Sequence, residues 1–417
     1  MRLSFFDGEV AAPKTVLIEV KKLKAYRENV NMVIATNNEK RPEYSLIHAA
    51  QPALHDELAA LKKRFSKIKH LVLIGIGGSS LGVEAVHSVL DTGAIKLSVL
   101  DTISAYEIEA LLTELHAIKK LEQLVVCVVS KSGGTTETLV NAGVVLAALE
   151  KKWGSKVYKQ TILIGDPATN FVSVGKKLGA TVVTMPKIVG GRYAVGTEIG
   201  LVPLTLLGHD VDSFIEGLID AGSEEFETIS ADGAARLALY MKKGYTHYNF
   251  FAFEKRLATL GAWYRQLFAE SIGKAEDNNK KPFSKGFLPT ISTPVELHSI
   301  GQLYLSGFSG VYTDFVTFDD ELSDYAISKK GIAKQFGRFG VQDVTTALYG
   351  GVVGAYVEKG LPHRATIFDD ALPYSLGLFM AMRMRETMYI AELMNVNAFN
   401  QPNVELYKQK TKAILGL

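Results

Sequence analysis

Short apolar runs and helix-like stretches alternate along the first half of the chain. Apolar runs that predict strands lie at residues 70–74, 97–100, 124–129, 161–164 and 181–185. Stretches with a helical spacing of apolar positions lie at residues 81–90, 105–118, 136–152 and 171–178. Continuous apolar runs separated by helices are typical of a doubly wound parallel sheet with helices on both faces.

The same alternation begins again after Pro203. Further strands are predicted at residues 247–253, 286–291 and 310–318, and helices are predicted over residues 257–270 and from Glu296 onward. We therefore expect an α/β protein with two doubly wound parallel-sheet domains, residues 1–205 and 206–394. Residues 395–417 then form a helical tail with a basic helix over residues 407–414.

The composition and net charge of the chain limit the kinds of function that it can have. The chain has 417 residues and a formal net charge of +2, which argues against nucleic acid or an anionic membrane as the main partner. Cys127 is the single cysteine, so no internal disulfide is possible, and a reducing cytoplasm fits. The N-terminal segment lacks a secretory apolar core. The most apolar predicted helix, residues 374–394, carries four charged side chains, which favours a core helix over a membrane span.

Two glycine-rich turns carry the clearest chemical signal. Residues 70–82 read HLVLIGIGGSSLG and residues 124–139 read LVVCVVSKSGGTTETL. Each is an apolar strand that breaks into a Gly/Ser/Thr turn and resumes as a helix, which leaves free backbone N–H groups that attract anions. Hydroxyl donors are available at Ser79, Ser130, Ser132, Thr135 and Thr136. We expect a phosphate monoester to bind between these two turns without a metal ion.

Two better-known phosphate motifs fit less well. A P-loop needs a Lys after its last glycine, but Lys131 precedes the glycines here. A dinucleotide site needs a third glycine where Ser80 stands. Because Asp101 follows the next apolar run, about where a ribose-binding acid would lie, a dehydrogenase stays a weaker alternative.

Four polar side chains outside these turns are candidates for catalytic or ligand-binding roles. Arg192 follows a Gly-Gly turn and suits a phosphate or a developing oxyanion. Glu270 ends an aromatic helix and could act as a general base. His298 and Lys408 are single polar candidates in the segments ELHSIGQ and NQPNVELYK. No combination of residues has the spacing of a metal site, and no G-x-S-x-G elbow occurs.

Taken together and in order, these segments resemble one family. The motifs are LIGIGGSSLG, VVSKSGGTTETL, GGRYAVGTEIGLVPL, AESIGK, LHSIGQ and QPNVELYK. They resemble glucose-6-phosphate isomerase, in its compact prokaryotic form, from about Leu71 to about Lys408. The resemblance implies two sugar-isomerase (SIS) type domains and an aldose–ketose isomerase of glycolysis and gluconeogenesis that needs no cofactor. It also implies a homodimer with shared active sites.

The resemblance also implies roles for single residues. Glu270 would carry the proton between C2 and C1 of the sugar, and Arg192 and Gln401 would stabilise the cis-enediol intermediate. His298, reaching in from the partner subunit, would open the sugar ring with help from Lys408. The substrate phosphate would bind at Gly78, Ser79, Ser130, Lys131, Ser132 and Thr135.

Two other functions remain open at this point. The same turns could serve the isomerisation of another sugar phosphate, such as mannose 6-phosphate. A sugar-isomerase domain can also be a non-catalytic sugar-phosphate sensor. The presence of two such domains, together with Glu270, His298 and Lys408, disfavours a sensor, and no helix-turn-helix pattern or basic stretch is found.

Overall fold

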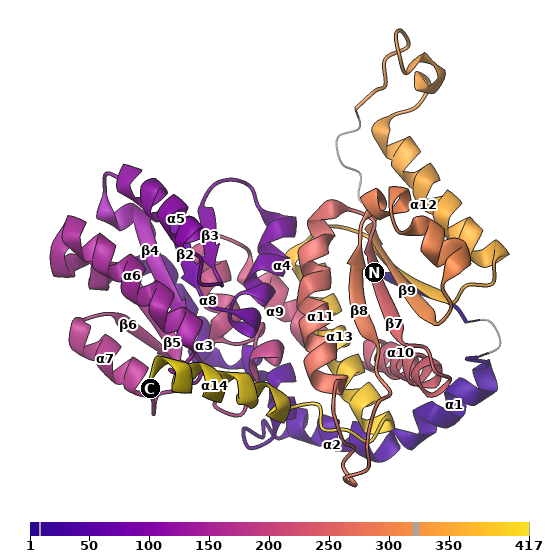
Figure 1. Ribbon diagram of the computed structural model, residues 1–417, viewed down its shortest axis with the longest axis horizontal. Helices are drawn as coiled ribbons and strands as arrows, with labels where there is room; N and C mark the ends of the chain where they lie inside the picture. The colour runs from indigo at the N-terminus through magenta and orange to yellow at the C-terminus, as the bar shows by residue number, and fades with distance from the viewer. Residues whose placement is uncertain (8–9, 320–324, 417) are drawn as a thin grey trace.

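Two five-stranded sheets lie in separate halves of the computed structural model, which describes residues 1–7, 10–319 and 325–416 (Figure 1). The first sheet has the order β3-β2-β4-β5-β6 and is parallel throughout. Its strands are β2 (His70–Ile74), β3 (Lys96–Leu100), β4 (Leu124–Val129), β5 (Thr161–Gly165) and β6 (Thr181–Thr184). All five strands were predicted, because each is a short apolar or β-branched run bounded by turn residues. The inner strands β2, β4 and β5 are buried along their whole length.

Helices cover both faces of the first sheet. Alternate side chains of β2 enter different cores: Leu71 and Leu73 join one apolar cluster, while Val72 and Ile74 join the other. The first cluster includes residues of α3 (Pro52–Arg64), α4 (Leu81–Leu90) and α8 (Glu198–Leu206). The second includes residues of α5 (Ala105–Ala117), α6 (Thr136–Trp153) and α7 (Asn170–Leu178).

The second sheet has the order β1-β10-β9-β7-β8. Its strands are β1 (Arg2–Phe6), β7 (His247–Ala252), β8 (Leu288–Ser292), β9 (Val311–Phe318) and β10 (His363–Phe368). On one face lie α10 (Glu224–Lys242), α11 (Ala258–Ile272) and α13 (Pro373–Leu393), and the other face packs against α12 (Val341–Glu358). The α/β fold class with two mainly parallel sheets is confirmed.

Two sequence-based expectations need correction. The segment 1–205 was expected to belong to the first domain, but β1 pairs antiparallel with β10 at the edge of the second sheet. This pairing joins residues more than 350 positions apart, and nothing local to the strand indicates it. The helix expected from Glu296 is instead a 3₁₀ turn (Pro294–His298) followed by a single π-turn (Leu303–Gly307). The division of the chain near residues 205 and 394 otherwise stays a prediction.

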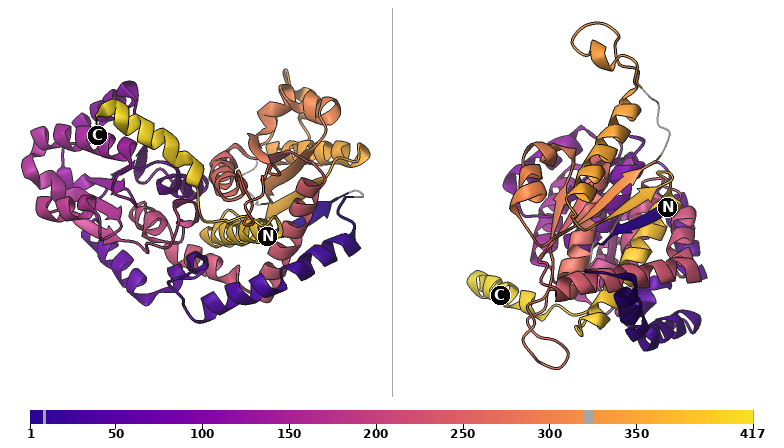
Figure 2. Two further views of the ribbon diagram at one scale, coloured as in Figure 1. Left: turned by 60° about the horizontal axis from the view of Figure 1, so that its bottom comes forward. Right: turned by 90° about the vertical axis from the view of Figure 1, so that its right-hand side faces the viewer.

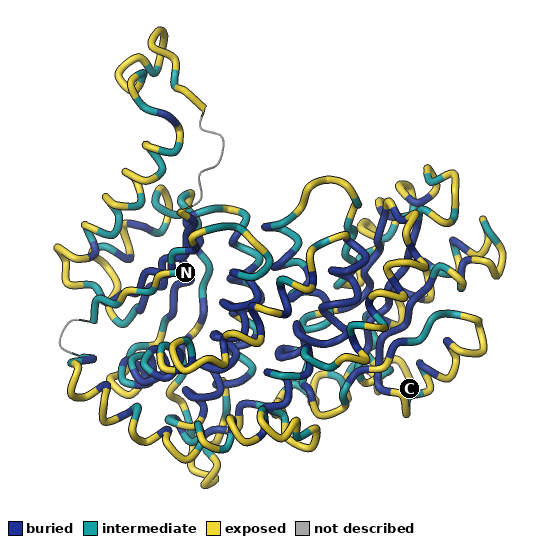
Figure 3. The backbone as a smooth tube through the Cα atoms, turned by 180° about the vertical axis from the view of Figure 1, so that it is seen from behind, coloured by how far each residue is buried: buried dark blue, intermediate teal, exposed yellow. Residues whose placement is uncertain are grey.

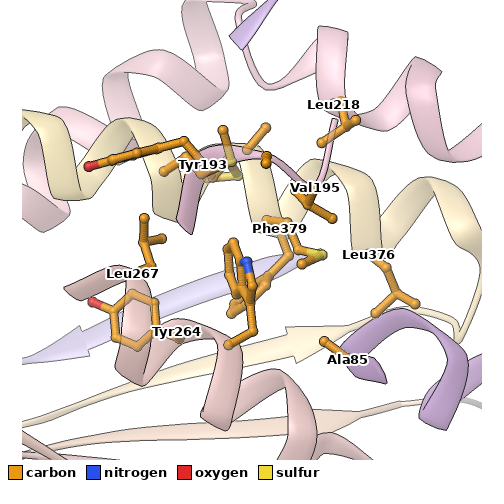
Figure 4. Packing of buried hydrophobic residues seen from close by; sticks show 14 of the residues in the cluster. Ala85, Tyr193, Val195, Leu218, Tyr264, Leu267, Leu376 and Phe379 are labelled. Atoms are coloured by element: carbon orange, nitrogen blue, oxygen red, sulfur yellow. The ribbon is translucent and has the colours of Figure 1, made fainter. Parts of the chain in front are cut away.

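Central helices join the two halves. The apolar packing between them includes Ala85 of α4, Tyr264 and Leu267 of α11, and Leu376 and Phe379 of α13 (Figure 4). The N-terminal helices α1 (Pro13–Lys22) and α2 (Lys24–Ala35) run along one side of both halves (Figure 2). The shared core therefore holds the carboxyl end of the first sheet against α11.

The charged helix α13 is a core helix, as expected. Arg383 and Glu386 are buried within it and pair with each other, and Arg383 also bonds Asp314 of β9 at 2.9 Å. None of the described helices is long and apolar enough to cross a membrane. In contrast to α13, α12 is largely exposed (Figure 3). The tail helix α14 (Glu405–Leu415) lies beside the first half, so the helical tail is also confirmed.

Candidate active site

The two glycine-rich turns lie side by side at the carboxyl edge of the first sheet. They follow β2 and β4, which are neighbours in the sheet. The helices that leave these turns, α4 and α6, pack on opposite faces. Such a switch point opens a crevice at the strand ends, which is where ligands bind in doubly wound sheets. The structure thus brings together the two turns expected to bind phosphate.

Glycine is required where the first turn meets the rest of the site. A Cβ atom on Gly78 would lie 2.2 Å from the carbonyl carbon of Gly191. Gly77 has a φ of +59°, and a Cβ there would lie 2.7 Å from Nε2 of Gln266 on α11. The turn that includes Ser79 therefore packs directly against the Gly191–Arg192 backbone and against α11.

The second turn leads into α6 and has internal hydrogen bonds. Ser130 is buried, and its Oγ donates to Oγ1 of Thr135 at 3.3 Å. The exposed Ser132 accepts from the N–H of Gly134 at 3.3 Å. Thr135 is the N-cap of the 18-residue helix α6, whose amino end favours an anion. Hydroxyls and a helix amino end thus meet at the expected phosphate position.

Lys131 links this turn to the loop that carries Arg192. Its Nζ donates to the carbonyl oxygen of Val189 at 2.8 Å. Burial lowers the pKa of Lys131; Asp166 opposes this, and the positive charge of Arg192 adds to it. The ammonium group of Lys131 is therefore close enough to Arg192 for the two positive charges to interact.

Arg192 is the centre of the site. It is 2% exposed, and its Nε donates to Oγ of Ser271 at 2.9 Å. Its Nη1 donates to Oε2 of Glu270 at 3.1 Å and to Oε1 of Gln401. Its Nη2 donates to the carbonyl oxygens of Ala398 and Asn400, at 2.7 and 3.1 Å. Five hydrogen bonds fix the plane of the guanidinium group, so its charge is held where an oxyanion could form.

Glu270 reaches the site from the last turn of α11. Its side chain is 33% exposed, in contrast to 1% for Arg192. Oε2 accepts from Arg192, and Oε1 accepts from Nε2 of Gln266 at 3.1 Å. A carboxylate that is oriented on one side and open to solvent on the other can take up a proton from a bound molecule.

Sequence reasoning missed three residues of this cluster: Gln266, Ser271 and Lys274. Gln266 and Lys274 stand four positions before and after Glu270, so their helical spacing was the available signal. Ser271 is buried and connects Arg192 to the hydroxyl of Tyr193, 2.9 Å from its Oγ. The Nζ of Lys274 donates to the carbonyl oxygens of Glu270 and Asn400, each at 2.6 Å.

His298 and Lys408 make no hydrogen bond or ion pair with this cluster in the described part of one chain. His298 is exposed on the 3₁₀ turn after β8, and in the described part of the chain its side chain has no hydrogen bond or ion pair. Lys408 on α14 pairs with Glu405 at 2.7 Å. Two further carboxylates stand in the matching motifs: Glu198 contacts His48 at 3.1 Å, and Glu137 lies in the first turn of α6.

No metal site accompanies the cluster in the part of the chain that the structure describes. Among these residues no group of three or more His, Cys, Asp or Glu side chains could hold an ion. The groups present are instead hydroxyls, backbone N–H groups, one fixed cation and one accessible carboxylate. Such a set can hold a phosphate and move a proton next to a carbonyl group.

Comparison with known proteins identifies the family of the chain. The family model "Phosphoglucose isomerase" matches residues 24–318. A glucose-6-phosphate isomerase of Lactiplantibacillus plantarum is 30% identical over 87% of this chain and 84% of its own length. A crystal structure of a hypothetical protein from Thermus thermophilus superposes with a TM-score of 0.85, at 25% identity over 99% of this chain and 100% of that one. A glucose-6-phosphate isomerase from Chlamydia trachomatis shares the fold with a TM-score of 0.79, at 19% identity over 99% and 88% of the two chains.

The fold and the family match together indicate a sugar-phosphate isomerase with two mainly parallel sheets. The family match covers well over half of the chain, from the second helix to the end of β9. The chain belongs to the phosphoglucose isomerase family, and the prediction made from the six motifs is confirmed.

Proposed function

We propose that this chain interconverts glucose 6-phosphate and fructose 6-phosphate with Glu270 as the proton-transfer base. Family membership supports the reaction, and its place in glycolysis and gluconeogenesis is typical of the family. The observation that carries the assignment of residues is the position of Arg192. It bonds Glu270 and Gln401 through the same nitrogen and lies against the Gly78 turn.

The phosphate group would be held away from the reacting carbons. Ser130, Ser132 and Thr135 surround the amino end of α6, and Lys131 and the Gly78–Ser79 turn lie at its side. Binding energy from a remote dianion can position the sugar without being part of the bond changes. This role explains why hydroxyls and backbone N–H groups, which do not react, are concentrated there.

Proton transfer needs one base and one fixed positive charge. The proton next to a carbonyl is weakly acidic, so its removal requires stabilisation of the enediolate oxygen. Glu270 can take the proton from C2 and return it to C1. Arg192 and Gln401 can stabilise the oxygen, because their polar groups meet beside that carboxylate. None of these steps uses a metal ion or redox cofactor.

Ring opening would use His298 from a second copy of the chain, assisted by Lys408. In support of a dimer, His298 is exposed beside an apolar groove of about 430 Å³ between residues 296–305 and α12. Leu297, Ile300 and Tyr304 line one wall, and Leu348 and Val352 line the other. An apolar surface of this kind is typical of a protein interface. The homodimer and the cytoplasmic location stay predictions.

A coupled assay tests the function directly. The protein is given fructose 6-phosphate, and formation of glucose 6-phosphate is followed through a dehydrogenase that reduces a nicotinamide cofactor. Turnover is expected, and no turnover by folded protein would contradict the proposal. The same assay with mannose 6-phosphate measures whether the pocket accepts the C2 epimer.

A further inference from the structure

Lys274 contacts the active-site cluster through backbone carbonyl groups. It lies two residues beyond the end of α11, and its side chain turns back toward the helix. Its Nζ donates to the carbonyl oxygen of Glu270, one of the last-turn acceptors that a helix leaves without an internal partner. The same Nζ donates to the carbonyl oxygen of Asn400. One ammonium group therefore joins the backbone of the base to the tail loop.

The tail loop brings Gln401 into the site. Asn400 directly precedes Gln401, and its carbonyl oxygen accepts from both Lys274 and Nη2 of Arg192. Gln401 itself accepts from Nη1 of Arg192. The relative position of Glu270 and Gln401 is thus set by two cations that share the Asn400 carbonyl. Arg192 acts through side-chain contacts, and Lys274 acts through the two backbones.

We propose that Lys274 is a positioning residue for the isomerisation, because its ammonium group fixes the backbone of Glu270 relative to the loop that carries Gln401. The inference rests on the proposed function of Glu270 and Gln401. Lys274 does not donate to either side-chain carboxylate or amide, so it acts through these neighbours. A shift of about 1 Å in a reacting group can lower a rate by roughly 100-fold, which makes such a bridge relevant to turnover.

The loop has further contacts besides those with Lys274. The ring of Phe399 packs against Tyr193 with centroids 5.3 Å apart, and the N–H of Asn400 donates to Oδ1 of Asn397 at 3.2 Å. Loss of the ammonium group should therefore loosen the position of the loop without unfolding it.

The charge of Lys274 gives the bridge a characteristic pH dependence. Burial, followed by the positive charge of Arg192, lowers the pKa of Lys274 to about 8, while Glu270 opposes the shift. These are the charged groups that face it, since residues 397–401 of the tail loop carry none. As pH rises through about 8 the ammonium loses its proton, the hydrogen bonds lose their charge assistance, and turnover should fall.

Three variants test the role: Lys274→Met, Lys274→Arg, and the matched control Lys285→Met on an exposed lysine eleven residues further on. Lys274→Met should lower kcat about 10- to 100-fold and leave the KM for fructose 6-phosphate within about twofold. Lys274→Arg should recover most of this loss and move the alkaline fall of kcat upward, because guanidinium does not titrate there. Lys285→Met should behave as the wild type.

Amide hydrogen exchange provides a second measurement that needs no turnover. Residues 398–404 should exchange faster in Lys274→Met than in the wild type or in Lys285→Met, while the exchange of β2 and β4 stays unchanged. Unchanged kcat together with unchanged exchange would overturn the proposal. So would an equal loss of kcat and thermal stability, since that pattern indicates a purely structural lysine. Failure of the isomerase function itself would appear in the wild type, and the exchange measurement would still decide whether the bridge exists.

Discussion

Arg192 and Glu270 lie 3.1 Å apart between Nη1 and Oε2, although 78 positions separate them in the sequence. Arg192 is enclosed by protein, whereas a third of the Glu270 side chain reaches solvent. This difference suits their proposed roles, because a fixed charge is best held rigidly and a base must reach its substrate. Their contact also joins the two halves of the molecule, since Arg192 follows the first sheet and Glu270 lies in the last turn of α11.

Replacing Glu270 by Gln should remove the base and keep the shape of the site. We expect kcat to fall by about 10²–10⁴-fold, with little change in the affinity for the ground-state analogue 6-phosphogluconate. Exchange of the C2 proton with deuterated water should fall in parallel, whereas ring opening should persist. The exposed Glu276 supplies the matched control, Glu276→Gln. If the C2 proton exchanges at the wild-type rate in the folded Glu270→Gln variant, the base must be another carboxylate, such as Glu137 or Glu198.

Removing two hydroxyls from the second turn should weaken phosphate binding. The double variant Ser130→Ala/Thr135→Ala loses side-chain donors beside the amino end of α6. The affinity for sugar phosphates and for inorganic phosphate should fall by roughly 1–3 kcal/mol, the scale of hydrogen bonds to a charged group. Titration calorimetry measures both ligands. Unchanged affinities in a folded variant would show that phosphate binds elsewhere.

A shared active site predicts complementation between two inactive variants. Glu270→Gln and His298→Ala chains are mixed under conditions that allow subunits to exchange. Each heterodimer then contains one site with both residues intact, so part of the activity should return. If heterodimers form and activity does not recover, each chain must use its own His298.

Gly78→Ala should disturb the site through backbone contact alone. The new methyl group would lie 2.2 Å from the carbonyl carbon of Gly191, so the turn or the Arg192 loop must move. We expect a loss of about 1–3 kcal/mol in the free energy of unfolding, together with lower kcat. Gly143→Ala in α6 is the control, because a Cβ there meets nothing within 4 Å. Full activity and stability of Gly78→Ala would contradict the close packing.

The free energy of unfolding should depend on pH through a histidine pair outside the active site. Nδ1 of His87 lies 2.9 Å from Nε2 of His209. Burial, then the neighbouring His87, lowers the pKa of His209 to about 4, against the opposing charge of Asp91. A pKa depressed below the ordinary value near 6.5 means that the unfolded chain binds more protons between pH 6.5 and 4. The stabilisation is complete above pH 6.5 and is lost as pH falls through 4.

His209→Gln tests this dependence by denaturant unfolding at pH 7.5, 6, 5 and 4. The wild type should lose roughly 2–3 kcal/mol more than the variant across this range. Parallel curves for the two proteins would show that other groups cause the acid loss. The exposed His116 supplies a control substitution, His116→Gln, that should keep the wild-type slope.

Features that arise from local patterns of residues could be predicted from the amino-acid sequence. The inner strands β2, β4 and β5 of the first sheet are buried, largely apolar runs, and such runs are recognisable without knowledge of their partners. The two phosphate-binding candidates could be predicted for the same reason, since a strand, a glycine turn and a helix start follow one another along the chain. Arg192, Glu270 and Gln401 could be proposed because the motifs around them match a family in order.

Which side chains contact one another depends on how distant segments pack. β1 pairs with β10 at the edge of the second sheet, although the two strands lie at opposite ends of the chain. The five residues of β1 contain no local pattern that indicates this partner. Position 78 requires glycine because the backbone of Gly191 approaches it closely. Lys274 can join two segments because the carbonyl oxygen of Asn400 lies within hydrogen-bond distance of its Nζ. His298 and Lys408 stand in matching motifs, but neither bonds to Glu270 within the described part of one chain. These relationships depend on packing between distant segments, which a local pattern of apolar and polar residues does not contain.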